Sequence, residues 1–329
     1  MGGRPLRVGV VGAGGMGACH ARNVAEIAGV ELAWVADPDD STGPEIAADL
    51  DCGWVPDANE AIDECDALVV ACPDRFHAHF LNAALARRLP VLCEKPMTVE
   101  LADGRRIIDT EQEIGRRLVQ VGFMRVYDER HVQVADAVAG LGVVNHIRSV
   151  HRNTNEVARP LDQMLVESMI HDIHSARWLS GAEIVEVRTS VVRRDRGIRM
   201  AILTCRLSNG GVATLEFDDA AAGYEVSIEV SADRGNVVSA ETPRAVVRAN
   251  GSVGAELGDD WFTPFLATYR AEMGDWLSSI GDGVARGPSA WDGYAAQCVV
   301  AAAVASYESG LAVPVELGDQ PNVYQEGPS

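Results

Sequence analysis

The feature that most constrains this chain is a β-branched run, Arg7–Val11, that leads directly into the segment 12–17, GAGGMG. This is the G-x-G-x-x-G spacing that joins a strand of a parallel sheet to the helix after it. The first glycine permits a tight turn, the second lets a diphosphate approach the backbone, and the third lets the helix pack on the strand. The N–H groups and positive dipole end of that helix can then bind phosphates. The pattern predicts a dinucleotide-binding turn.

A second apolar run, Val30–Ala36, ends in an acid, Asp37, about twenty residues after the last glycine. A carboxylate at this place accepts hydrogen bonds from the ribose 2′-hydroxyl and would repel a 2′-phosphate. Asp37 therefore favours NAD over NADP. The alternative is a glycine-rich turn of another kind, with Asp37 in a solvated loop.

Composition narrows the class of protein and its partners. The 329 residues are enough for two domains, and the net charge of -20 disfavours nucleic acid and anionic membrane as partners. The seven cysteines are scattered and form no C-x-x-C, which is typical of a reducing compartment, so we expect a cytoplasmic protein. No apolar stretch is long enough to span a membrane. In so acidic a chain, backbone N–H groups must do most of the phosphate binding.

The first third alternates short apolar runs with helical patterns, which predicts an α/β fold with a doubly wound parallel sheet, a Rossmann domain over residues 1–122. The expected strands are Arg7–Val11, Leu32–Ala36, Ala67–Ala71, Val91–Cys93 and Leu118–Val121. The expected helices are Met16–Ile27, Pro44–Leu50, Phe76–Ala86 and Ala102–Ile114.

Residues 123–329 are predicted to form an α+β domain with a mostly antiparallel, open-faced sheet, because polar and apolar residues alternate along their strands. The expected strands are Val143–His151, Ile184–Val192, Met200–Leu207, Val212–Phe217, Tyr224–Ser231 and Ala245–Ala249. Helices at about Met164–Leu179, Phe265–Ile280 and Ala290–Tyr307 are expected to flank this sheet. The residues after Val315 are expected to form a polar tail.

The segment Cys93–Pro96 follows a strand of the first domain, so Lys95 is expected at the carboxyl edge of the sheet, where such enzymes bind ligands. There a lysine can hydrogen-bond a substrate hydroxyl. The alternative is a surface lysine beside a loop proline.

In the second domain, a regular helix would place Glu167, His171 and His174 on one stripe, next to an apolar stripe, with Asp172 off the polar one. A carboxylate one turn before a histidine can fix its tautomer and raise its basicity, as a general base requires. A solvated face with two histidines is the alternative. A zinc site is disfavoured, because no third ligand stands at a telling spacing.

The glycine turn, Cys93–Pro96 and the Glu167…His171 helix, in that order, resemble the Gfo/Idh/MocA family of NAD(P)-dependent sugar and cyclitol oxidoreductases over nearly the whole chain. The segment 66–77, DALVVACPDRFH, is similar to the family's strand and Pro-Asn-x-x-His loop beside the nicotinamide, with Asp74 where Asn is common. The segments most similar to inositol 2-dehydrogenases are 120–125, 150–153 and 287–294.

The resemblance implies oxidation of a cyclitol ring hydroxyl to the ketone, with Lys95, Glu167 and His171 as the catalytic set. His171, oriented by Glu167, would take the hydroxyl proton while Lys95 stabilises the same oxygen and the hydride passes to the nicotinamide. The implied cofactor-binding residues are Gly12, Gly14, Gly15, Met16, Gly17, Asp37, Cys72, Pro73, His77, Glu94 and Lys95. The implied polyol-binding residues are Lys95, Arg125, His151, Asn153, Glu167, His171, His174 and Tyr224.

The resemblance also implies a homo-oligomer, a tetramer or a dimer, joined through the open face of the second sheet. Two positions depart from the family's pattern: Glu167 stands where Asp is usual, and His174 stands where a second acid is common. An aminocyclitol or aldose dehydrogenase of secondary metabolism therefore stays open as an alternative. A non-catalytic dinucleotide- and sugar-sensing regulator of the same fold is a second alternative, against which the retention of Lys95, Glu167 and His171 argues.

Overall fold

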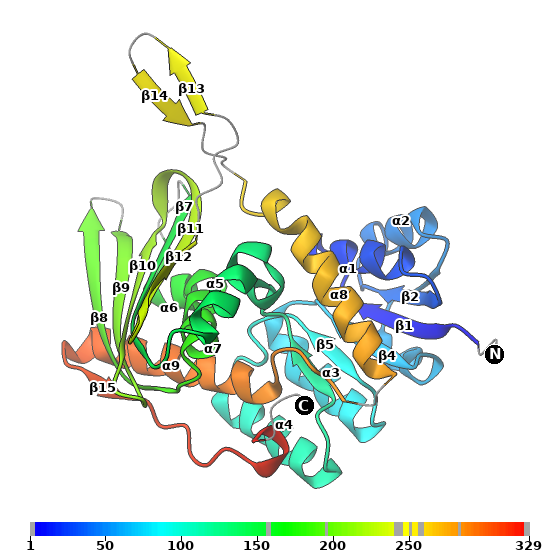
Figure 1. Cartoon of the computed structure of the whole chain (residues 1–329). Coiled ribbons are helices and arrows are strands. Elements are labelled where there is room, and N and C mark those ends of the chain that lie inside the picture. The colour runs from blue at the N-terminus through cyan, green and yellow to red at the C-terminus, as the bar shows by residue number, and fades with distance from the viewer. Residues whose placement is uncertain are drawn as a thin grey trace. The chain divides into compact units, whose positions relative to one another are not determined.

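The structure, a computed structural model, describes residues 4–155, 159–194, 197–239, 246–249, 252–255, 260–281 and 284–325 (Figure 1). No helix within these ranges is long and apolar enough to cross a membrane. The chain divides into two compact units. The first consists of Met1–Met124, Ala267–Tyr294 and Gly318–Ser329, and the second of Arg125–Leu266 and Ala295–Leu317.

The first unit contains a parallel sheet of six strands in the order β3-β2-β1-β4-β5-β6, the doubly wound Rossmann order. The sequence prediction of this fold is confirmed. The strands are β1 Leu6–Val11, β2 Val30–Ala36, β3 Gly53–Val55, β4 Ala67–Val70, β5 Val91–Cys93 and β6 Val119–Val121. The helices between them are α1 Gly15–Ala25, α2 Thr42–Asp49, α3 His77–Ala86 and α4 Leu101–Ile114.

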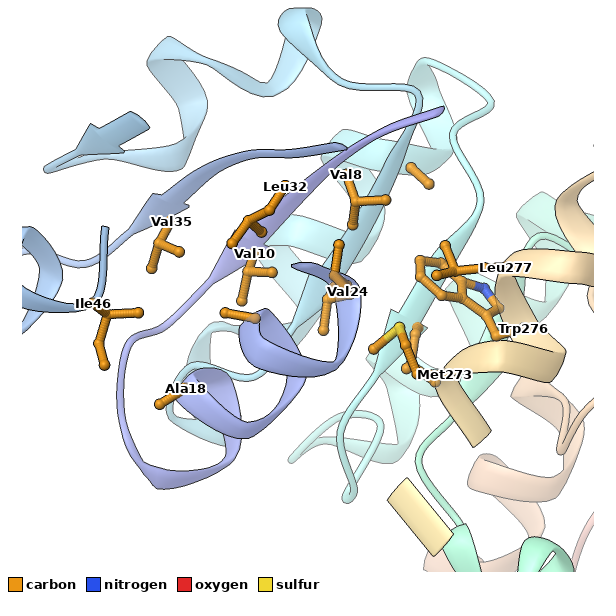
Figure 2. Packing of buried hydrophobic residues seen from close by; sticks show 14 of the residues in the cluster. Val8, Val10, Ala18, Val24, Leu32, Val35, Ile46, Met273, Trp276 and Leu277 are labelled. Carbon is orange, nitrogen blue, oxygen red and sulfur yellow. The ribbon is translucent and has the colours of Figure 1, made fainter. Parts of the chain in front are cut away.

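A helix from late in the chain completes the core of the first unit. In α8 (Leu266–Ile280), Met273, Trp276 and Leu277 pack with the apolar side chains of β1, β2 and α1 (Figure 2). The prediction that this helix flanks the antiparallel sheet is therefore wrong. Its apolar stripe was correctly identified, but periodicity does not tell a helix which sheet it will cover.

The second unit contains a mixed, mostly antiparallel sheet in the order β12-β11-β7-β10-β9-β8-β15, in which β7 and β10 are parallel. This agrees with the predicted class. The strands are β7 Val144–Thr154, β8 Ile184–Arg194, β9 Gly197–Leu207, β10 Val212–Asp218, β11 Ala220–Ala232, β12 Gly235–Val238 and β15 Val313–Pro314.

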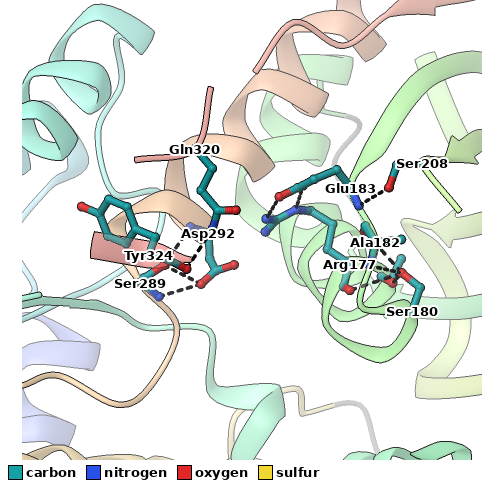
Figure 3. A network of polar contacts seen from close by, with 10 residues as sticks. Arg177, Ser180, Ala182, Glu183, Ser208, Ser289, Asp292, Gln320 and Tyr324 are labelled. Atoms are coloured by element: carbon teal, nitrogen blue, oxygen red, sulfur yellow. Dashed lines mark hydrogen bonds and ion pairs between the residues drawn. The ribbon is translucent and has the colours of Figure 1, made fainter. Parts of the chain in front are cut away.

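The helices of the second unit pack against this sheet: α7 (Ile170–Ser180) contacts β7 and β10, and Thr189 of β8 donates a hydrogen bond of 2.8 Å to a carbonyl of α9 (Ala290–Ser309). The remaining helices are α5 Glu129–Ala139 and α6 Leu161–Met164. Of these, α5 was not predicted. At the end of α7, Arg177 forms an ion pair of 2.6 Å with Glu183, just before β8 (Figure 3).

The strand predicted at 245–249 does not join either large sheet. Its residues from Val246 on form β13 (Val246–Ala249), which pairs with β14 (Ser252–Ala255) in a separate hairpin (Figure 1), whereas Ala245 lies outside the described residues. A four-residue run shows a strand but not its partner, because neighbouring strands are chosen by tertiary packing.

The residues after Val315, predicted to form a polar tail, include a segment that is anchored to the first unit, and residues 326–329 lie outside the described part. Tyr324 is buried and its hydroxyl donates a hydrogen bond to the carboxylate of Glu111 in α4. Glu111 also accepts the backbone N–H groups of Leu118 and Val119. Gln320 donates a bond of 3.1 Å to the Tyr324 carbonyl (Figure 3). Burial raises the pKa of Glu111.

We predict that Tyr324→Phe destabilises the protein by about 1–3 kcal/mol, because Glu111 would lose one donor while staying buried. Urea unfolding measures this loss. Tyr307→Phe is the matched control, since its hydroxyl bonds to Arg193 at an exposed place, and it should cost less than about 0.5 kcal/mol. Equal effects of the two variants would contradict the proposed anchoring.

Candidate functional site

The turn between β1 and α1 has the close contacts that the glycine spacing predicts. Gly12 has a φ of +100°, and a Cβ built on Gly17 would lie 1.9 Å from the carbonyl oxygen of Gly12. By contrast, a Cβ on Gly14 or Gly15 would meet no protein atom within 4 Å. No side chain caps the start of α1, and its first turn holds no acid. An open helix N-terminus of this kind fits a diphosphate.

Asp37, which follows β2, is hydrogen-bonded to this turn. One carboxylate oxygen accepts the backbone N–H of Ala13 at 2.7 Å, and the other accepts that of Asp39 at 2.9 Å. The contact brings the carboxylate beside the glycine turn.

His77 links two loops that the sequence singled out. Its Nδ1 lies 2.8 Å from the carbonyl oxygen of Pro96, and its Nε2 lies 2.8 Å from that of Cys72, in the loop that continues through Pro73. Since both ring nitrogens face backbone carbonyls, we expect His77 to position the Cys72 and Pro96 loops rather than to contact a cofactor directly.

Lys95 follows β5, and its backbone is held by the preceding residue. The Lys95 N–H donates to Glu94 Oε2 at 3.2 Å, while Glu94 Oε1 lies 2.8 Å from Nε2 of the buried His20. Burial of Glu94 opposes ionisation, but the hydrogen bond and charge of His20 dominate and lower the pKa of Glu94. Glu94 is therefore ionised, and its carboxylate is hydrogen-bonded to the backbone N–H of Lys95.

Lys95 is also the only lysine in the sequence, because 27 of the 28 Lys and Arg residues are arginines. The prediction of a catalytic lysine was based on the motifs alone, although the sequence also shows that no other lysine is present. A guanidinium stays protonated in proteins, whereas an ammonium can release a proton. Lys95 therefore carries the one ammonium side chain in this sequence.

In the second unit, Glu167 lies in a π-helical turn, Leu165–Met169, between α6 and α7. One Glu167 oxygen accepts from Arg159 Nη1 at 2.6 Å, and the other accepts from Gln163 Nε2 at 2.6 Å. Sequence reasoning missed both partners. The predicted stripe assumed regular α-helical spacing, and a π turn changes the angle between Glu167 and the residues that follow.

Arg159 connects Glu167 to a second acid. Its Nε donates to Asp219 Oδ2 at 2.9 Å, and its Nη2 donates to Asp219 Oδ1 at 2.5 Å. Although partial burial opposes it, the hydrogen bonds and charges of Asp219 and Glu167 raise the pKa of Arg159. Glu167, which is longer than the Asp usual in the family, is thereby held by Arg159, and Arg159 also binds Asp219.

His171 and His174 are both buried in α7. The alternative of a solvated helix face with two histidines is therefore wrong. Among the described residues, no group of three or more His, Cys, Asp or Glu is arranged to hold a metal ion.

Asp172 lies at the centre of a buried cluster, although the sequence reasoning placed it off the polar stripe and gave it no role. Its Oδ1 accepts from Arg125 Nη1 at 2.5 Å and from Ser149 Oγ at 2.7 Å, and its Oδ2 lies 3.0 Å from His151 Nδ1. Burial opposes its ionisation, but Arg125 and His151 hold the pKa of Asp172 well below its usual range.

The same cluster brings together three residues expected to bind the polyol: Arg125, His151 and Tyr224. The His151 ring packs edge-on against that of Tyr224, with centroids 5.8 Å apart. Burial lowers the pKa of His151, so its ring is neutral, and its Nδ1 lies 3.0 Å from Asp172 Oδ2 and 3.1 Å from Arg125 Nη2. Burial raises the pKa of Tyr224 to about 12, so its hydroxyl remains a donor.

Asn153 follows His151 by two residues on β7 and so points to the same side of the strand. Its Oδ1 is buried, and the interaction of its side chain with His151 opposes the lowering of the His151 pKa by burial.

A sheet in the order 3-2-1-4-5-6 with an open helix N-terminus beyond a glycine turn defines the Rossmann class of dinucleotide-binding folds. The family model described as an NAD-binding Rossmann fold matches residues 6–123, and the model of the C-terminal alpha/beta domain matches residues 146–317. The chain therefore belongs to the Gfo/Idh/MocA family of oxidoreductases, which confirms the resemblance drawn from its motifs.

Relatives similar over the full length carry the name inositol 2-dehydrogenase. The one from Rubrobacter xylanophilus is 35% identical, covering 97% of this chain and 96% of its own length. Inositol 2-dehydrogenase 1 of Saccharopolyspora erythraea is 36% identical, covering 97% and 99%. Myo-inositol dehydrogenase from Lactobacillus casei, solved in complex with NAD(H) and myo-inositol, superposes with a TM-score of 0.91 at 26% identity, covering 98% of this chain and 100% of that one.

We predict that Asp172→Asn destabilises the protein by about 3–5 kcal/mol at pH 7, because Arg125 would stay buried without its counter-ion. The native pKa of Asp172 is depressed, so its contribution is fully present above the ordinary value of about 3.9 and is lost as the pH falls below it.

Urea unfolding at several pH values should therefore show a gap between wild type and D172N that narrows below about pH 4. Asp136→Asn, at an exposed position of α5, is the control and should show no such gap. A D172N variant as stable as wild type at pH 7 would exclude a structural role for this charge.

Proposed function

We propose that this chain is an NAD-dependent dehydrogenase that oxidises one ring hydroxyl of a cyclitol to the ketone, as its relatives' name, inositol 2-dehydrogenase, describes. Full-length similarity at 35% and 36% identity supports the assignment. The Lactobacillus casei protein with NAD(H) and myo-inositol bound supports both the cofactor and the substrate class.

The observation that carries the proposal is the polar lining of the second unit. A vicinal polyol offers hydroxyls that donate and accept in alternation. The side chains of Asn153, His151 and Tyr224 lie on the paired strands β7 and β11, the His151 ring is neutral, and the Tyr224 hydroxyl is a donor. Together these groups match a ring of hydroxyls better than an apolar or purely anionic ligand.

The residues of the glycine turn support NAD as the cofactor. The space in front of Gly14 and Gly15 suits a diphosphate, and Met16 and Gly17 begin the helix that would receive it. Asp37 beside that turn is placed to bind a ribose hydroxyl and to repel a 2′-phosphate.

We assign the chemical roles as the family resemblance implies. NAD⁺, when bound, supplies the hydride acceptor. His171 takes the proton of the reacting hydroxyl, and Lys95 hydrogen-bonds the same oxygen and stabilises its developing negative charge. Glu167, which accepts hydrogen bonds from Arg159 and Gln163, orients His171, and His174 contacts a further substrate hydroxyl.

We further propose that residues 1–122 bind the dinucleotide, while residues 123–329 bind the polyol and carry the contacts of a homo-tetramer or homo-dimer. The second sheet supports this, since one of its faces carries ion pairs such as Arg148–Glu216 and Arg206–Glu186.

A second candidate keeps the reaction and changes the substrate to an aminocyclitol or an aldose. The contact between Arg159 and Glu167 favours this candidate. Glu167 is longer than the Asp usual in the family, and Arg159 holds its carboxylate in a different place. Since Arg159 lies between Glu167 and Asp219, these three groups carry a net negative charge, which suits an amine.

We predict that Lys95→Met lowers kcat by at least about 100-fold, as expected for the loss of a group that acts on the reacting oxygen. Lys95→Arg should fail similarly, since a planar guanidinium does not place a compact ammonium donor at the reacting oxygen. The Kd of NAD, measured by fluorescence titration, should change by less than about threefold in both. A variant near full rate would remove Lys95 from the mechanism.

Initial rates with NAD and NADP across myo-inositol, scyllo-inositol, aminocyclitols and glucose test the substrate. We expect turnover with an inositol isomer and NAD, and turnover only with aminocyclitols would favour the second candidate. Dinucleotide binding with no turnover of any of these compounds would instead support the sensing regulator.

A further inference from the structure

The loop between β2 and α2, which begins at Asp37, is packed against a tryptophan that has no part in the proposed reaction. Trp54 is the middle residue of β3, and its partner in the parallel ladder is Val35 of β2. Paired residues of neighbouring strands point to the same face of a sheet. Val35 packs in the core with Ile46 of α2 (Figure 2), so the indole of Trp54 lies on the side of the sheet that α2 covers.

The indole binds the residue that is proposed to select the ribose. Nε1 of Trp54 donates a hydrogen bond of 3.2 Å to the backbone carbonyl of Asp37. The backbone N–H of Asp37 donates to the carbonyl of Val55 at 3.2 Å, so both backbone groups of Asp37 are bound to β3. Its carboxylate is bound separately, by the N–H groups of Ala13 and Asp39. The backbone and the side chain of Asp37 are therefore held together in one place.

Gly43, in the first turn of α2, allows the helix to lie directly on this indole. A Cβ built on Gly43 would lie 2.4 Å from Nε1 of Trp54 and 3.3 Å from the Cβ of Asp37. A side chain at position 43 would have to push the indole away, and the indole would then lose the carbonyl of Asp37. The close approach of α2 thus keeps the Trp54 hydrogen bond in place.

Asp39 supports the same loop from its other end. Its Oδ1 accepts the backbone N–H of Ser41 at 2.8 Å and that of Thr42 at 3.1 Å. The hydroxyl of Ser41, and next these N–H groups, lower the pKa of Asp39, so a replacement of Asp39 would change the charge of the loop. Trp54 can be replaced without any change of charge, and because it is already 36% exposed its variants are expected to fold.

We propose that Trp54 is a positioning residue for cofactor selection: its hydrogen bond to the Asp37 carbonyl holds the Asp37 carboxylate where it binds a ribose hydroxyl and repels a 2′-phosphate. The proposal rests on the NAD preference proposed above. A carboxylate in a loosened loop can turn aside, so it binds the ribose less well and also admits the phosphate. Loss of the Trp54 hydrogen bond therefore changes the ratio of the NADP and NAD affinities, whereas a merely structural role would lower both affinities equally.

The first test compares two replacements of Trp54 in the full chain. Trp54→Phe removes the indole N–H. Trp54→His can keep it, because Nε2 of an imidazole and Nε1 of an indole both lie two bonds from the ring atom that carries the side chain. The Kd values of NAD and NADP are measured by isothermal titration calorimetry, without substrate.

The loss of one hydrogen bond should lower the ratio of the NADP Kd to the NAD Kd by about three- to tenfold in W54F. W54H should restore most of that ratio. Trp261→Phe, at a tryptophan that is 52% exposed in the second unit, is the matched control and should leave the ratio unchanged. An unchanged ratio in W54F, or an equal loss in W54H, would overturn the proposal.

The second test asks whether Trp54 acts through Asp37. Asp37→Ala removes the repelling carboxylate and should lower the ratio by at least about tenfold. In the D37A background, W54F should change the ratio by less than about 1.5-fold, because no carboxylate is left to position. A W54F effect of the same size in both backgrounds would contradict the proposal.

The proposed function and this inference fail in different ways. If wild type binds NAD and NADP equally, NAD is not the selected cofactor, and the inference falls with it. If wild type prefers NAD and W54F keeps the whole preference, only the role of Trp54 is rejected.

Discussion

The contact between the first turn of α1 and the end of β1 is the constraint on which the rest of the first unit depends. Residue 17 can only be glycine, because the Gly12 carbonyl occupies the space of a side chain. This approach seats α1 on the sheet and brings its N-terminus beside Asp37. It also sets the depth of His20, one turn further on, and so the place of Glu94 behind Lys95. The close packing at Gly17 thus helps to determine the position of the proposed catalytic lysine.

The second unit builds its site on a different principle, the pairing of charges away from water. The chain carries a net charge of -20, yet the buried carboxylate of Asp172 is bound by a guanidinium, a hydroxyl and an imidazole. In a medium of low dielectric such a network holds each member in one orientation. Net charge therefore predicts the partners of the molecule as a whole but not the polarity of its site.

Much of the fold could be read from local patterns. The strands of the first sheet are buried on both sides and appear as unbroken apolar runs, and the glycine turn has a spacing that few other structures require. The site was less accessible. Asp172 looks like a surface residue because its partners, Arg125, Ser149 and His151, are distant in sequence. The Glu167 contacts depend on a π turn, and no residue type marks such a turn reliably. The assignment of α8 to the first sheet likewise depends on tertiary packing.

The packing of Trp276 in the core of the first unit has a consequence for folding during synthesis. The apolar side chains of β1 and α1 are made first, but the helix that covers them follows only after residues 125–266. On the ribosome, the nascent first unit exposes that apolar surface while all strands of the second sheet except β15 are translated. A polypeptide released early, anywhere before α8, would carry an uncovered core and be prone to aggregate or to meet a chaperone.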